Sequence, residues 1–157
     1  MSKLTVPAPL AVALEALAGA DKVSVIEEWR RFGDAFACRL RITLEGTPTV
    51  FVPQETDWHA VAKPDYPLGD LVIFPAKRDG ITATFPHQAY NTEGHGPELG
   101  PLPWRPGHPC LTHPLAALGG RVREPPDAAE RLAWQVGRLQ LWLSAAAAGR
   151  LQQPGEP

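Results

Sequence analysis

The sequence predicts an α+β domain in which a helix stands at each end of an antiparallel sheet and a long proline-rich loop precedes the last helix. Three observations carry this prediction. Apolar and polar side chains alternate strictly over residues 36–45, as in a strand with one buried face. Short links with turn-forming residues join this segment to other apolar runs, which favours a meander. An apolar stripe with the period of a helix occupies residues 126–148.

The N-terminal helix is predicted from three leucines. Leu10, Leu14 and Leu17 are spaced by four and then three residues, which places their side chains on one face of a helix. Gly19 follows this stripe, and glycine is a typical residue at a helix end. We therefore expect a short helix with one apolar face.

A four-stranded antiparallel meander is predicted next, with residues 36–45 as its clearest strand. Cys38 belongs to the apolar register of this strand, so it is expected to be buried and to have no chemical role. His59 is expected at the surface. The other strands are predicted at residues 23–31, 49–52 and 71–74, with a possible short fifth strand at 80–85.

Residues 86–114 are predicted to form one long loop, because their many prolines and glycines prevent long regular elements. Large apolar side chains recur along it, so the loop is expected to pack on the body of the domain. Long loops inside compact domains are often functional, and this one carries Cys110.

The closing helix is predicted over residues 126–148, with Asp127 at its start and Gly149 at its end. Trp134 and Trp142 lie off its leucine stripe and indicate a second contact face, for which packing against the loop is favoured over a partner surface. The residues predicted to be buried are Leu132, Val136, Leu139 and Leu143.

Length and composition limit the class of protein. A chain of 157 residues is expected to form one domain, residues 1–150, with a frayed tail at 151–157. Its formal net charge is -2 with no long basic run, so no nucleic-acid partner is expected. The most apolar stretch, residues 139–148, is too short to cross a bilayer, so no membrane partner is expected. Two cysteines and a start without a signal-peptide pattern favour a cytoplasmic protein.

The surroundings of Cys110 suit a reactive thiol. Prolines and a glycine restrict the backbone around it, and His108 and His113 lie close in sequence. An imidazolium nearby can raise the fraction of thiolate, which is the nucleophilic form. Trp104 begins the same stretch and is a candidate wall for the thiol. We therefore predict that Cys110 is accessible and, unlike Cys38, is the working residue.

Several motifs after residue 60 resemble one family. They read YPLGD at residues 66–70, FPAK at 74–77, GITATFPHQ at 80–88 and WRPGHPCL at 104–111. Further on stand EP at 124–125 and RLAW at 131–134. Together they resemble the bacterial ubiquitin-conjugating-like domains found in ubiquitin-like modification and anti-phage defence operons. The resemblance implies a trimmed ubiquitin-conjugating fold.

The resemblance also implies an activity. Cys110 would accept the C-terminus of a ubiquitin-like protein as a thioester and pass it to an amine of a target protein. Eukaryotic members carry a His-Pro-Asn motif before the cysteine, where this chain has His87, Gln88 and then Asn91. These three remain alternatives for supporting the oxyanion or the loop. No metal or cofactor is implied, and a separate activating enzyme is expected because no Gly-rich phosphate loop is present.

Other classes of function remain open. A Cys-His hydrolase would use Cys110 as nucleophile with His87 or His113 as base, and would need no carrier protein. A non-catalytic binding module of the same fold would make the cysteine incidental. A zinc site of His108, Cys110 and His113, with His87 or His95 as fourth ligand, is less favoured because prolines interrupt it and no second cysteine anchors it.

Overall fold

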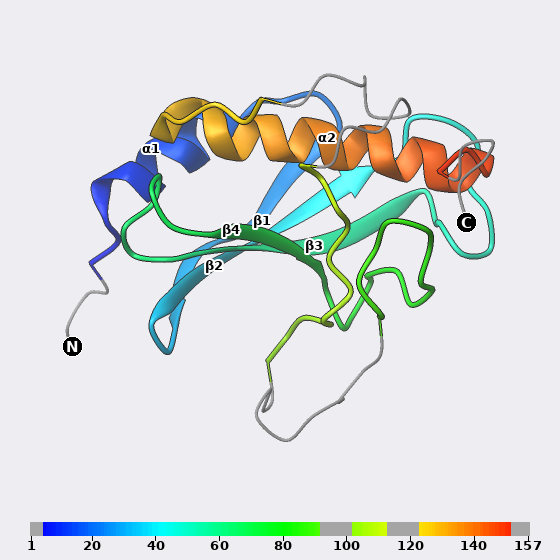
Figure 1. Ribbon diagram of the computed structural model, residues 1–157, viewed down its shortest axis with the longest axis horizontal. Helices are drawn as coiled ribbons and strands as arrows, with labels where there is room; N and C mark the ends of the chain where they lie inside the picture. The colour runs from blue at the N-terminus through cyan, green and yellow to red at the C-terminus, as the bar shows by residue number, and fades with distance from the viewer. Residues whose placement is uncertain (1–4, 92–101, 113–122, 152–157) are drawn as a thin grey trace.

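The computed structural model describes residues 5–91, 102–112 and 123–151. The four strands form one antiparallel sheet in the order β1-β2-β3-β4. Figure 1 shows α2 lying across one face of this sheet, and α1 packs against α2. The predicted α+β class is thereby confirmed. The elements are α1 (Ala8–Leu17), β1 (Val23–Phe32), β2 (Ala35–Thr43), β3 (Glu55–Ala62), β4 (Leu71–Pro75) and α2 (Ala128–Ala148).

Both helices form where the sequence predicts them. The Asp127 carboxylate accepts a hydrogen bond from the Glu130 amide at 3.2 Å, which caps the first turn of α2. Gly149 ends α2 with a φ of 71°, a left-handed conformation that glycine adopts without strain. The predicted apolar stripe of α2 is buried throughout. In the part of the chain that the structure describes, neither helix is long and apolar enough to cross a membrane.

The third strand was predicted in the wrong place. Residues 49–52 form a tight turn instead, in which the Thr49 hydroxyl accepts hydrogen bonds from the amides of Phe51 and Val52 at 3.2 and 3.0 Å. The third strand is β3, and its residues are buried on both faces of the sheet. Its polar Asp57 and His59 alternate with Trp58 and Ala60, but the segment contains no Ile, Leu or Phe, the residues that marked the predicted strands, which is why the sequence pattern missed it.

The possible fifth strand at residues 80–85 is also not found. The carbonyls of Ile81 and Ala83 accept hydrogen bonds from the Asn91 side-chain amide, not from a neighbouring strand. A side chain thus takes the place of a strand partner, and the segment stays irregular.

The core lies between the inner face of the sheet and the two helices. Cys38 is buried there, as predicted, and burial raises the pKa of its thiol to about 12. Trp142 of α2 is also fully buried and meets Trp58 and Phe85 edge-on. Its contact face is therefore part of the core. Of the predicted frayed tail, Leu151 packs in the core, and residues 152–157 lie outside the described residues.

The outer face of the sheet is partly covered as well. His59 was predicted at the surface, but it is only 2% exposed, because Trp104 lies against it with ring centroids 5.5 Å apart. Burial, helped by the positive charge of Arg39, lowers the pKa of His59 to about 4. The imidazole Nε2 is buried without a hydrogen-bond partner among the described residues. His59 is therefore a neutral component of the packed outer face.

Candidate functional site

Cys110 lies on residues 102–112, here called the cysteine segment, which extends the edge of the sheet beyond β4. Ala76 and Trp104 form an antiparallel bridge. Beside it, the Arg105 amide donates to the Pro75 carbonyl at 2.7 Å and the Lys77 amide donates to the Pro103 carbonyl at 2.9 Å. In Figure 1 the segment then runs from this edge toward α2. Its first half is thus fixed to the sheet by main-chain bonds.

The second half of the cysteine segment pairs with residues 80–91, here called the arm. The Cys110 amide donates to the His87 carbonyl at 2.8 Å, and the Ala89 amide donates to the His108 carbonyl at 3.0 Å. Gln88 and Pro109 form the antiparallel bridge between these bonds. The arm therefore brings the predicted residues at positions 87 and 88 alongside the cysteine, although about twenty residues separate them in sequence.

Asn91 sits behind this pairing and is 5% exposed. Its side-chain amide donates to the carbonyls of Ile81 at 2.8 Å and Ala83 at 3.2 Å, so both amide hydrogens are used within the arm. Its side chain also lies against Gly107, where an added Cβ would stand 2.3 Å from the Asn91 Cβ. This geometry favours loop support over oxyanion support for Asn91.

Gln88 ties the arm to the cysteine segment through both ends of its amide. Its Oε1 accepts a hydrogen bond from the Phe85 amide at 2.6 Å, and its Nε2 donates to the Gly107 carbonyl at 2.9 Å. The neighbouring His87 has a φ of 60°, in the left-handed region that costs a residue with a side chain on the order of 1 kcal/mol. These contacts hold the arm in the shape that presents the His87 carbonyl to Cys110.

The two cysteines occupy opposite environments. Cys110 is exposed, whereas Cys38 is enclosed in the core. A cysteine attacks its substrate as a thiolate, and the sulfur must also be accessible. The raised pKa of Cys38 keeps its buried sulfur protonated. Cys110 is therefore the thiol that a second protein can reach.

Trp104 and His108 form part of an aromatic cluster on the outer face of the sheet. The Trp104 ring stacks on Phe74 with centroids 5.9 Å apart and meets the Phe32 ring edge-on at 5.2 Å. The His108 ring meets Phe74 edge-on at 5.5 Å. Both residues thus anchor the cysteine segment to the sheet. The predicted His113 lies outside the described residues.

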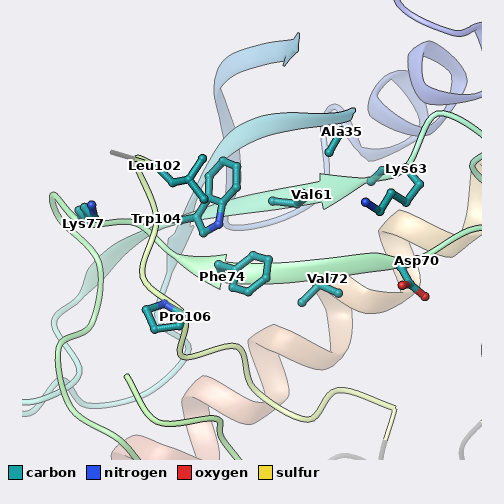
Figure 2. Close-up of a pocket in the computed structure, with 11 residues that line it drawn as sticks. Ala35, Val61, Lys63, Asp70, Val72, Phe74, Lys77, Leu102, Trp104 and Pro106 are labelled. Atoms are coloured by element: carbon teal, nitrogen blue, oxygen red, sulfur yellow. The ribbon is translucent and has the colours of Figure 1, made fainter. Parts of the chain in front are cut away.

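A pocket of about 320 Å³ adjoins this cluster (Figure 2). The rings of Trp104 and Phe74 line one end of the pocket. Val61 of β3 and Val72 of β4 line the part between that end and Lys63. Lys63 and Asp70 lie at the far end from Trp104. Trp104 therefore belongs to the cysteine segment and also lines the pocket.

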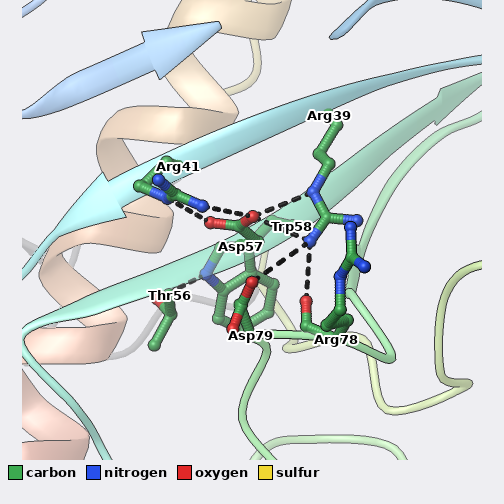
Figure 3. A network of polar contacts seen from close by, with 7 residues as sticks. All are labelled: Arg39, Arg41, Thr56, Asp57, Trp58, Arg78 and Asp79. Atoms are coloured by element: carbon green, nitrogen blue, oxygen red, sulfur yellow. Dashed lines mark hydrogen bonds and ion pairs between the residues drawn. The ribbon is translucent and has the colours of Figure 1, made fainter. Parts of the chain in front are cut away.

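The turn that leads into the arm is fixed by a network of charges (Figure 3). The Asp57 carboxylate accepts hydrogen bonds from Arg39 Nε at 2.8 Å and Arg41 Nε at 2.7 Å. Arg39 Nη2 donates onward to the Arg78 carbonyl at 2.7 Å, and the Asp57 amide donates to the Asp79 carbonyl at 2.8 Å. Burial acts to raise the pKa of Asp57, but the bonds from the two arginines outweigh it and the pKa is lowered.

Within the described ranges, no three His, Cys, Asp or Glu side chains come together in a group that could hold a metal ion. His95 and His113 lie outside those ranges, so the zinc alternative with these ligands is not placed.

The fold and the site define an α+β domain that presents one exposed thiol on a doubly braced loop. The chain is similar to the ATP-dependent ubiquitin transferase-like protein Cap2 of Enterobacter hormaechei subsp. hoffmannii (strain UCI 50), with 29% identity over 154 residues. The match covers 96% of this chain and 25% of Cap2, so the chain spans about a quarter of the length of that relative. No protein-family model matches the chain.

Proposed function

We propose that this chain is a ubiquitin-conjugating-like carrier that accepts a ubiquitin-like protein as a thioester on Cys110 and transfers it to an amine of a target protein. The observation that carries the proposal is the contrast between an exposed Cys110 on a braced loop and a buried Cys38. The similarity to Cap2, whose name describes a ubiquitin transferase-like protein, supports the same class of reaction. A bacterial modification or anti-phage defence system is the proposed setting.

Loading is an exchange of one thioester for another. The Cys110 thiolate attacks the carbonyl carbon at the modifier's C-terminus, which a separate activating enzyme holds as a thioester. A bond from carbon to Sγ forms, the bond to the activating enzyme's sulfur breaks, and that sulfur leaves as a thiolate that takes a proton from solvent. ATP is consumed in the earlier activation, which is assigned to the activating enzyme.

Discharge moves the same acyl group to nitrogen. An amine of the target attacks the thioester carbonyl, the carbon–nitrogen bond forms, and Cys110 leaves as a thiolate while the nitrogen loses a proton to solvent. Because a thioester is already activated toward amines, the protein must mainly hold the carbonyl and stabilise the oxyanion. A braced loop with few polar groups is sufficient for this task.

The three predicted support residues divide between two roles. Asn91 and Gln88 brace the loop, since their amides are bonded to carbonyls of the arm and of Gly107. His87 is proposed as the oxyanion donor through its imidazole, because its main chain lies beside Cys110; its carbonyl accepts the Cys110 amide and is not a donor. His108, whose carbonyl bonds to the arm, positions the residues just before the thiol.

Reconstitution with the cognate activating enzyme, ATP and the ubiquitin-like protein tests the proposal. The expected product is an adduct that a reducing agent releases, because thiols exchange with thioesters. Cys110→Ser should form an oxyester that survives reduction, and Cys110→Ala should form no adduct. Cys38→Ala is the matched control and should load like the wild type.

The rival classes give different results in the same experiment. A binding module would retain affinity for its partner but form no adduct with any variant. A hydrolase would turn over a simple thioester without the activating enzyme. Loading that persists unchanged in Cys110→Ala would overturn the proposal.

A further inference from the structure

A buried arginine of α2 reaches the cysteine segment. Arg138 is only 5% exposed, and its Nε donates a hydrogen bond to the carbonyl of Leu111, the residue that follows Cys110. Its guanidinium also lies over the Trp134 ring, 4.9 Å from the centroid. Arginine keeps its charge when buried, although burial lowers the pKa of Arg138. The core of this domain thus contains a cation next to the cysteine segment.

The position of this cation is costly for the fold. Removing a charged group from water is unfavourable unless bonds inside the protein replace the lost hydration. An apolar residue at position 138 would continue the buried stripe of α2 at no such cost, since the neighbouring Leu139 and the following Trp142 are fully buried. The bond to the Leu111 carbonyl therefore points to a role in holding the cysteine segment.

The chain passes from the surface to the core within one peptide unit. Cys110 is exposed, whereas the Leu111 side chain is 4% exposed and belongs to the core cluster. On the N-terminal side of the thiol, the Cys110 amide is bonded to the His87 carbonyl at 2.8 Å. On the C-terminal side, the Leu111 carbonyl is bonded to Arg138. The amide of Cys110 is thus held by the arm, and the residue that follows the thiol is held through both its side chain and its carbonyl.

We propose that Arg138 is a positioning residue for Cys110, and this inference rests on the proposed function. Its bond holds the carbonyl of Leu111, the residue next to the thiol, and charge-assisted bonds of this kind are stronger than neutral ones. Arg138 thereby restricts the movement of the residue next to Cys110, which favours the geometry that thioester exchange requires.

A second arginine of α2 provides a matched control. Arg131 also donates hydrogen bonds to main-chain carbonyls of a loop, namely those of Pro67, at 2.8 Å, and Gly69. It forms an ion pair with Glu124 at 2.9 Å. Its loop precedes β4 and does not carry the thiol. Arg131→Met should therefore lower stability by removing comparable contacts, without a selective effect on Cys110.

The test compares Arg138→Met, Arg138→Lys and Arg131→Met in single-turnover loading and discharge, with folding followed by circular dichroism and urea unfolding. For Arg138→Met we expect kcat to fall about 10–100-fold, the range of effects caused by small misplacements of a reacting group, with KM for the activating enzyme unchanged. Arg138→Lys should recover most of kcat, because it keeps a charged donor. Arg131→Met should retain kcat per folded molecule.

Chemical rescue keeps the test decisive if Arg138→Met folds poorly. Millimolar guanidinium should restore discharge to Arg138→Ala, since the ion fits the space that the side chain leaves, and should not affect Arg131→Ala. If activity falls only in proportion to the folded fraction in both sets of variants, Arg138 has only a structural role and the inference is wrong. The same holds if Arg138→Met keeps the wild-type kcat.

Failure of the proposed function would be recognised separately. In that case the wild type would not load at all, and the inference would be tested by the rate at which iodoacetamide alkylates Cys110, which needs no partner. Arg138→Met should then change the alkylation rate severalfold relative to Arg131→Met, because the segment that carries the thiol is no longer held. Equal rates in these two variants would overturn the inference.

Discussion

The amide of Cys110 donates to the carbonyl of His87 at 2.8 Å, so the thiol is held by a main-chain bond to a residue that precedes it by 23 positions. Together with the bond between the Ala89 amide and the His108 carbonyl, it makes a short antiparallel pair. The orientation of Cys110 therefore depends on the arm, and changes that disturb the arm should disturb the thiol.

Alkylation of the folded protein should distinguish the two cysteines. Iodoacetamide is expected to label Cys110 within minutes and to leave Cys38 unlabelled until the protein is unfolded, because Cys38 is buried and its pKa is raised to about 12. Peptide mapping by mass spectrometry measures both sites in one sample. Preferential labelling of Cys38 would contradict the assignment of the accessible thiol.

Gly107→Ala should displace the cysteine segment. Its new Cβ would stand 2.3 Å from the Asn91 Cβ, and overpacking of this kind costs about 1–3 kcal/mol of unfolding free energy. Loading through Cys110 should slow as well, beyond the loss of folded protein. Gly137→Ala in α2 is the control: it meets no atom within 4 Å, and removing a glycine from a helix should stabilise by about 1 kcal/mol. Urea unfolding measures both variants.

His59 should make the protein less stable as the pH falls from about 6.5 to about 4. Burial lowers its pKa in the folded state to about 4, whereas the unfolded chain takes up the proton near 6.5. The contribution of neutral His59 is therefore complete above pH 6.5 and is lost as the pH falls through the folded pKa. His59→Phe should flatten the dependence of urea midpoints on pH in this window. An unchanged slope would show that His59 is not the group responsible.

Asp57 should affect the pH dependence of stability in a more acidic range than His59 does. Its pKa is lowered in the folded state, so its contribution is present above the unfolded value of 3.8 and is lost as the pH falls through the folded pKa. Asp57→Asn should cost about 3–5 kcal/mol at neutral pH, since it leaves Arg39 without its carboxylate partner, which is only 1% exposed. The same substitution should remove the acid-induced loss below pH 3.8. Thermal unfolding between pH 7 and pH 3 checks both effects.

The sequence is sufficient for the elements whose signals are local. The cap at Asp127 and the stop at Gly149 each depend on neighbouring residues, and the structure contains both. The alternation around Cys38 correctly predicts a strand, but not that Ala37 and Arg39 on its other face are buried as well. The strand β3 has only a weak signal, since it contains no Ile, Leu or Phe, and its polar Asp57 and His59 are buried by arginines and a tryptophan from other parts of the chain. Tertiary contacts decide that strand, and a local pattern cannot contain them.

The candidate site divides in the same way. The exposure of Cys110 follows from its proline-rich surroundings, which the sequence displays directly. Arg138 is different: 27 residues separate it from Leu111, and within α2 it looks like an ordinary charged residue of a helix surface. Its role becomes visible only when α2 is laid across the sheet, because its partner is a main-chain carbonyl that has no sequence signature.

Because main-chain bonds pair the arm with the cysteine segment, the position of the Cys110 sulfur depends little on which side chains surround it. The bonds at His87 and His108 use carbonyl oxygens, which every amino acid supplies. Side chains at such positions can be exchanged over evolutionary time while the sulfur keeps its location, within the limit that the positive φ at position 87 favours glycine or asparagine as replacements. Substitutions at these positions can thus alter the surface around the sulfur without moving it.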